Sequence, residues 1–101
     1  MPQTVTQPQA PTSISFLAVI RPKEHSFAEI RLRAAGFDRI RRSKDGLMIV
    51  ATTALFQRTF GITLAPRAGW RGMPGEQAWE IPAGTGVPRA WQDVLTDIVL
   101  A

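Results

Sequence analysis

The hydrophobic pattern of the chain opens with a dense apolar run over residues 14–20, which ends at Arg21 and Pro22. A run of this length bounded by proline predicts a buried strand. Residues 1–13 contain three prolines, three glutamines and no charged side chain. Such a segment cannot bury enough surface to offset its loss of conformational entropy. We therefore predict a disordered lead over 1–13 and a single domain over 14–101.

The next segment, residues 26–35, has the spacing of a helix that ends at Gly36. Ser26 and Glu29 stand three residues apart, as in a capping box, where each side chain bonds a free amide at the helix start. A glycine directly after a helix can adopt positive φ and close the last turn. The predicted core face of this helix is apolar and consists of Phe27, Ile30, Leu32, Ala34 and Ala35.

A hairpin and a second helix follow. Asp45-Gly46 separates a short run near Phe37 and Ile40 from the apolar residues 47–50, which predicts two strands joined by a turn. A short helix over 53–60, with Thr52 or Thr53 as its N-cap, ends at Gly61 in the same way as the first helix. Residues 62–64 then predict the start of a further strand.

The remaining chain is rich in glycine and proline. Residues 66–76 predict a loop, and the alternating residues 78–82 predict a short edge strand. Pro88 suits the first turn of a helix. Four apolar side chains then recur at helical spacing and predict a last helix over 88–98: Trp91, Val94, Leu95 and Ile98.

The order of these elements predicts an α+β, ferredoxin-like βαββαβ fold. Its antiparallel sheet carries the helices on one face, and a C-terminal helix follows. The other sheet face is left free, and free sheet faces dock RNA in some folds and protein in others.

Composition excludes several classes of chemistry. The 101 residues include no cysteine and one histidine, His25, so a nucleophile–base set or a metal site has no obvious ligands. We predict a chain that is not an enzyme and holds no cofactor or metal. No apolar run reaches the roughly 18 residues of a membrane helix, and no signal-peptide pattern opens the chain, which by default favours the cytoplasm.

Positive charge leaves two partner classes open. The net charge is +4, and six basic side chains lie within fourteen residues: Arg31, Arg33, Arg39, Arg41, Arg42 and Lys44. Such a cluster fits either the solvated outer faces of a helix and hairpin or a phosphate-binding surface. The strand over 47–50 has no aromatic ring to stack a base, which disfavours the known RNA-reading pattern.

The stretch from Ala34 to Leu64, with its Gly36-Phe37 and Phe60-Gly61 pairs, resembles the activation prodomain of sedolisin-type (kumamolisin-like) serine peptidases. Ile81-Pro82, and then Val87-Pro88, are similar to the end of that prodomain. The chain has no room for the catalytic domain or the long linker of the family, so the resemblance is to a short, free-standing prodomain.

This resemblance implies a non-catalytic protein-binding role, as inhibitor or folding chaperone of a serine peptidase or as a recruited interaction module. The predicted binding residues are Trp70, Arg71 and Met73 in the glycine- and proline-rich loop, together with Arg41 and Arg42. Tryptophan and arginine are enriched in binding hot spots. The alternative is a basic nucleic-acid-binding module of the same fold, in which Arg41 and Arg42 would dominate.

Overall fold

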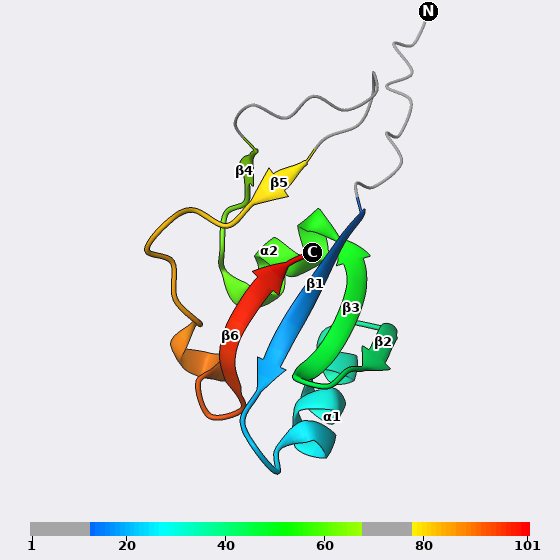
Figure 1. Ribbon diagram of the computed structural model, residues 1–101. Coiled ribbons are helices and arrows are strands. Elements are labelled where there is room, and N and C mark those ends of the chain that lie inside the picture. Colours follow the sequence, from blue (N-terminus) through cyan, green and yellow to red (C-terminus); the bar gives the residue numbers. More distant parts are fainter. Residues whose placement is uncertain (1–12, 68–77) are drawn as a thin grey trace, which may run out of the picture.

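The structure is a computed structural model that describes residues 13–67 and 78–101. Its elements run in the following order (Figure 1): β1 Ser13–Ile20, α1 His25–Ala35, β2 Arg39–Arg42, β3 Gly46–Thr52, α2 Thr53–Phe60, β4 Ala65–Pro66, β5 Trp79–Glu80, a 3₁₀ helix η1 Arg89–Trp91, and β6 Leu95–Leu100. The disordered lead predicted for 1–13 lies outside the described residues except for Ser13, which begins β1. Trp70, Arg71 and Met73 also lie outside them.

The fold is α+β, as predicted. Four strands form an antiparallel sheet in the order β2-β3-β1-β6, and β4 and β5 form a separate two-stranded sheet. Both α-helices lie behind the larger sheet in Figure 1, so its front face is not covered by a helix of the described chain. Since β1 covers residues 14–20 and β2 and β3 pair around the turn at Asp45, the predicted first strand and the predicted hairpin are confirmed.

The core lies between the larger sheet and the two helices and is built on four phenylalanines. Phe16, fully buried in β1, has its ring centroid 4.9 Å from that of Phe56 and 5.8 Å from those of Phe37 and Phe60. Trp91 packs on the edge of the same cluster, with its centroid 5.3 Å from that of Phe60. Edge-to-face ring pairs at these distances add to the free energy of burial.

Both predicted helix ends are confirmed. Gly36 has φ 116° after α1 and Gly61 has φ 67° after α2, so each glycine adopts the left-handed conformation that closes a helix. Thr52 is the N-cap of α2, because its Oγ1 accepts a hydrogen bond of 3.1 Å from the amide of Leu55.

The predicted capping box of α1 is wrong. The N-cap is Glu24, with no side-chain hydrogen bond, and Ser26 lies inside the first turn. Glu29 instead contacts arginines: its carboxylate lies 3.4 Å from Nε of Arg33 and 3.7 Å from Nε of Arg42.

The predicted core face of α1 is correct for Leu32 and Ala35 but wrong for the other three residues. Ala28 and Leu32 are buried, whereas Phe27 and Ile30 are 49% and 66% exposed. The small Ala28 lets the helix approach a sheet whose interior is already filled by phenylalanines from other elements. Ala34 is also exposed, so an apolar stripe of α1 faces outward.

The helix predicted over 88–98 is wrong. Only the 3₁₀ turn η1 forms there, and residues from Leu95 onward form β6, which supplies the fourth strand of the sheet. The pairing with β1 shifts between Val19 and Ile20, leaving Thr96 as an extra residue. This β-bulge places the buried Leu95 and Ile98 three residues apart in the sequence. That spacing is typical of one face of a helix, so the sequence pattern of this strand predicts a helix.

Two smaller strand predictions are wrong in extent. Residues 62–64 form no strand; the amide of Leu64 donates a 2.9 Å hydrogen bond to Oε1 of Gln57 instead of joining a ladder. Of the edge strand predicted over 78–82, only Trp79–Glu80 is a strand, which pairs with β4, and the carbonyl of Ala78 accepts a 2.9 Å hydrogen bond from the amide of Arg67.

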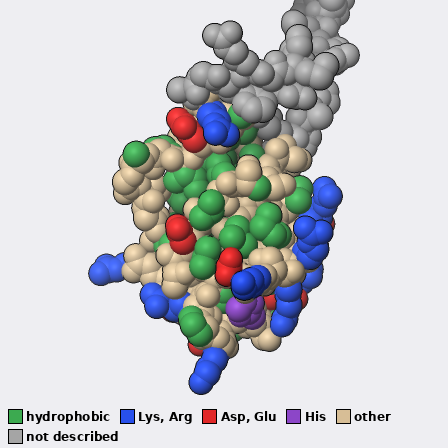
Figure 2. Space-filling model, in the orientation of Figure 1, with side chains coloured by type: hydrophobic (Ala, Val, Ile, Leu, Met, Phe, Trp, Pro, Cys, Tyr) green, Lys and Arg blue, Asp and Glu red, His purple; other side chains and the backbone are tan. Residues whose placement is uncertain are grey.

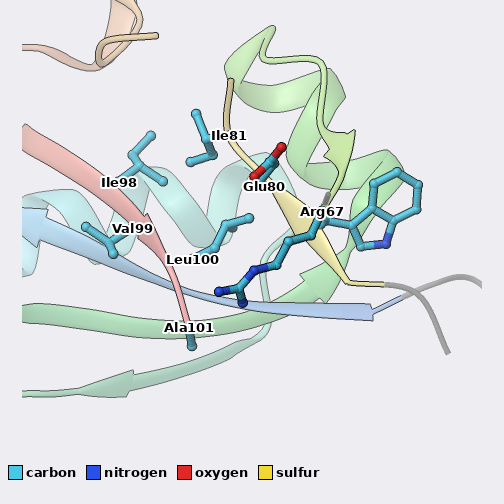
Figure 3. Close-up of a pocket in the computed structure, with 8 residues that line it drawn as sticks. Arg67, Glu80, Ile81, Ile98, Val99, Leu100 and Ala101 are labelled. Carbon is cyan, nitrogen blue, oxygen red and sulfur yellow. The ribbon is translucent and has the colours of Figure 1, made fainter. Parts of the chain in front are cut away.

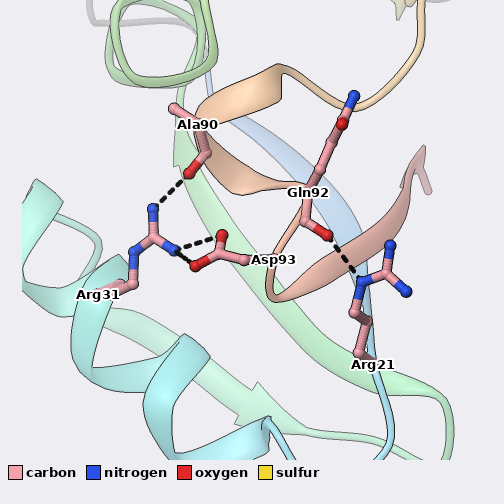
Figure 4. Close-up of polar contacts among 5 residues, drawn as sticks. All are labelled: Arg21, Arg31, Ala90, Gln92 and Asp93. Atoms are coloured by element: carbon pink, nitrogen blue, oxygen red, sulfur yellow. Dashed lines mark hydrogen bonds and ion pairs between the residues drawn. The ribbon is translucent and has the colours of Figure 1, made fainter.

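An arginine fixes the loop that leads into β6. Nη1 of Arg31, on α1, donates to both carboxylate oxygens of Asp93 at 2.7 and 2.8 Å, and its Nη2 donates to the carbonyl of Ala90 at 2.6 Å (Figure 4). Its guanidinium also lies 4.5 Å from the ring centroid of Trp91. Nε of Arg21 donates to the carbonyl of Gln92 at 2.7 Å. These contacts join the end of β1 and the helix α1 to the start of β6.

Candidate protein-binding face

The candidate site is the face of the four-stranded sheet that points away from the helices, which we call the open face. Along β1 the buried residues alternate with half-buried ones, and the latter, such as Leu17, point to the open face. The pairing registers place the following side chains on this face: Ser15, Leu17 and Val19 from β1, Met48 and Val50 from β3, Arg39 and Arg41 from β2, and Asp97 and Val99 from β6.

The middle of the open face is apolar. Leu17 is paired with Met48 on one side and with Val99 on the other, and Arg41 continues the same row on β2. Val99 is 45% exposed, which is high for an apolar strand residue. Figure 2 shows hydrophobic side chains over the strands of this face and a line of basic side chains along the β2 side. We call Leu17, Met48, Val50 and Val99 the apolar band.

The two sides of the apolar band differ in charge. Arg39 and Arg41 flank it on β2, and Asp97 stands on β6. Neither Arg39 nor Arg41 makes an ion pair or side-chain hydrogen bond with another described residue, whereas Arg31 and Arg33 each bind a carboxylate. The open face therefore has two guanidinium groups available to a partner.

A hollow of about 410 Å³ lies on the β2 side of this face. Its lining includes two arginines and one acid, Arg39, Arg41 and Asp38, around the apolar side chains of Met48 and Val50. A carboxylate next to an apolar group fits such a lining better than a purely polar ligand does.

The structure separates the two arginines that the sequence places together. Arg41 lies on the open face, but the neighbouring Arg42 points to the helix side, where it meets Glu29. The companion of Arg41 is Arg39, which the site prediction omitted. Alternation along a strand over 39–42 predicts that Arg39 and Arg41 share a face, because side chains two residues apart point to the same side of a sheet. Alternation along β3 likewise places Met48 and Val50 together.

A second hollow, of about 370 Å³, lies between the two-stranded sheet and β6 (Figure 3). Figure 3 shows the Arg67 side chain extending across it toward Leu100 and Ala101. Nε1 of Trp79 is buried and has no hydrogen-bond partner among the described residues. Among the described residues that line it, Glu80 is the one acid, and none is a serine, threonine or histidine.

The clearest pKa shift in the described chain is that of Asp93. The hydrogen bonds from Arg31 lower the pKa of Asp93 below its usual 3.8, because they favour the charged carboxylate. Within residues 13–67 and 78–101 no group of three histidines or acidic residues could hold a metal ion. No described helix is long and apolar enough to cross a membrane.

Comparison with known proteins gives no match, whether to a family model, a curated protein or a solved structure. The resemblance to sedolisin-type prodomains therefore stays a prediction from the sequence.

Proposed function

We propose that this chain is a non-catalytic protein-binding domain that docks its open face on another protein. The observation that carries the proposal is the apolar band, half-buried except for the exposed Val99, on a sheet face that no helix of the described chain covers. Contiguous exposed apolar surface on a small domain marks an interaction site. An apolar centre bordered by arginine is also the usual anatomy of a protein interface.

The proposed partner is a serine peptidase, which the domain inhibits or helps to fold. This part of the proposal rests on the resemblance of residues 34–64 to peptidase prodomains. Trp70, Arg71 and Met73 stay predicted contacts. Arg41 borders the apolar band and fits the same role, whereas Arg42 points to the other side of the sheet.

The proposed fold type is ferredoxin-like. The order β2-β3-β1-β6 supports this assignment, since α1 links β1 to β2 and α2 stands between β3 and β6 in the chain. The assignment requires β6 to be the fourth strand of the motif, with the small β4–β5 sheet as an insertion between α2 and β6.

Inhibition of a sedolisin-type catalytic domain, purified without its own prodomain, tests the proposed function. We expect the chain to reduce peptidase activity in a saturable manner. Val99→Asp should weaken inhibition roughly 30-fold, the equivalent of about 2 kcal/mol for a contact at the interface centre. Val99 is exposed, so the substitution should leave the fold intact.

Ile30→Asp is the matched control. Ile30 is also an exposed apolar residue, but it lies on the outer side of α1, away from the open face. We expect Ile30→Asp to inhibit as the natural chain does. Equal weakening by both variants, or no inhibition and no binding by the natural chain, would contradict the proposal.

Nucleic-acid binding is the second candidate, favoured by one observation: Arg39 and Arg41 lie side by side on the open face without acidic partners in the described chain. None of the side chains that the described strands place on the open face is aromatic, so these strands offer no ring for base stacking. This candidate predicts binding of single-stranded RNA that falls steeply with added salt. Such binding, without any effect on a peptidase, would replace the first candidate.

A further inference from the structure

The outer edge of β2 has backbone groups available for another strand. The amide of Ser43 donates to the carbonyl of Gly46 at 2.8 Å and closes the two-residue turn between β2 and β3. In an antiparallel pair, residues that exchange hydrogen bonds alternate with residues that do not. Because Ser43 is hydrogen-bonded to Gly46, Arg41 and Arg39, two and four residues before it, are also hydrogen-bonded to β3. The N–H and C=O groups of Ile40 and Arg42, which alternate with them, point outward. No described strand pairs with that side of β2.

The charges on β2 determine which kind of strand can pair with its outer edge. The strand reads Arg-Ile-Arg-Arg, and Arg39 and Arg41 stand on the open face with no carboxylate bound to them in the described chain. A second copy of β2 would place arginine opposite arginine, which destabilises a strand pair. The same edge favours a strand whose acidic side chains alternate, since they would lie beside both arginines on one face.

The hollow on the β2 side of the open face adds apolar contact to this edge. It extends from Arg39 and Arg41 to Met48 and Val50 and measures about 410 Å³. A carboxylate near the arginines can thus be accompanied by aliphatic carbons that cover the methionine and valine. Nucleic acid would meet the arginines but would leave the outward N–H and C=O groups of β2 without strand partners.

We propose that the β2 edge binds an extended acidic segment of a partner protein as a fifth strand of the sheet. Main-chain hydrogen bonds to Ile40 and Arg42 would supply affinity, and acidic side chains beside Arg39 and Arg41 would supply specificity. The main-chain hydrogen bonds form at the sheet edge, and the site shares only Met48 and Val50 with the apolar band, so the inference goes beyond the proposed function and requires no peptidase.

The test uses a ten-residue synthetic peptide of alternating glutamate and valine, with alternating lysine and valine as its control. Amide hydrogen exchange of the isotope-labelled chain is followed by NMR. At a peptide concentration ten times the dissociation constant, exchange of the Ile40 and Arg42 amides should slow about tenfold. The amides of Arg39 and Arg41, already bonded to β3, should change little. The lysine peptide should protect none of them.

Two variants separate the contributions of backbone and charge. Arg42→Pro removes one outward N–H at an edge position that tolerates proline, and it should weaken binding of the glutamate peptide relative to Arg42→Ala. The double variant Arg39→Glu with Arg41→Glu should reverse the preference, so that the lysine peptide binds more tightly.

Three results would overturn the inference: no binding of the glutamate peptide; binding without protection of Ile40 and Arg42; or an unchanged preference in the double glutamate variant. Binding of oligouridine RNA in place of the peptide would assign the arginines to nucleic acid instead. Because this assay contains no peptidase, it can fail while Val99→Asp still weakens peptidase inhibition, and the reverse outcome is equally distinguishable.

Discussion

Replacing Gly46 with alanine should destabilise the protein more than its small size suggests. A Cβ atom at Gly46 would lie 1.9 Å from the carbonyl oxygen of Ala18 and 2.9 Å from its carbonyl carbon. Real Cβ atoms essentially never lie within 3.0 Å of another atom, so the carbonyl oxygen of Ala18 would have to withdraw by at least about 1.1 Å. Ala18 is fully buried in β1, and its strand pairs with β3 on one side and β6 on the other.

The size of the effect follows from that geometry. Overpacking in a filled core costs typically 1–3 kcal/mol, and here the obstacle is backbone rather than a side chain that can rotate away. We therefore expect Gly46→Ala to lower the free energy of unfolding by about 3 kcal/mol or more. For a domain of this size, that corresponds to a fall of roughly 12–24 °C in the melting temperature.

Two other glycines provide matched controls. Gly61 has no atom within 4 Å of a Cβ position but has φ +67°, so Gly61→Ala should cost about 1 kcal/mol through backbone strain alone. Gly86 has free space and no positive φ, so Gly86→Ala should be neutral or slightly stabilising. Thermal and urea unfolding followed by circular dichroism gives the ranking. Gly46→Ala within 1 kcal/mol of the natural chain, or less harmful than Gly61→Ala, would refute this reasoning.

Two further predictions concern polar contacts. Thr52→Ala removes the N-cap hydrogen bond of α2 and should cost about 1 kcal/mol in urea unfolding, whereas Thr53→Ala, one position later, should cost clearly less; equal losses would contradict the capping role. The pKa of Asp93 is lower in the folded chain than its usual 3.8, so its stabilising effect is complete above that value and is lost as pH falls through the folded pKa. The stability difference between the natural chain and Asp93→Asn should therefore be constant near neutrality and shrink below pH 3.8; a difference that persists at lower pH would exclude the ionic contact with Arg31.

Features with a single local cause could be predicted from the sequence. Gly36 and Gly61 each follow a helix and adopt positive φ, because few other residues accept that conformation. The apolar run of β1 likewise predicts a buried strand without reference to the rest of the chain. The pair Asp45-Gly46 predicts the hairpin, but Gly46 is the first residue of β3 and has no positive φ; the close approach of Ala18 explains why a side chain is excluded there.

Features that depend on packing elsewhere in the chain could not be predicted from the sequence. Phe27 and Ile30 have the helical spacing of a core face, but the core is filled by Phe16, Phe56 and their neighbours, so the smaller Ala28 faces inward. Leu95 and Ile98 have helical spacing only because a bulge adds one residue to β6. Neither effect is visible in a single segment of sequence.

The candidate site was predicted in part. The presence of a sheet face without a helix over it follows from the order of elements, and Arg41, a predicted binding residue, lies on that face. Arg42 was grouped with Arg41 by adjacency, although strand alternation places adjacent residues on opposite faces. The apolar band requires strand registers that join β1, β3 and β6, and these become known only from the folded chain.

The central strand β1 bears on how the chain acquires its fold during synthesis. Phe16 pairs with Ile49 on one side, but on the other side with Leu100. A growing polypeptide can therefore assemble the hairpin and both helices well before β1 obtains its second neighbour. Until β6 emerges, one edge of an apolar strand stays open to pairing with other chains, a hazard typical of topologies rich in long-range contacts. Removing residues 95–100 should consequently yield an aggregating product rather than a smaller stable domain.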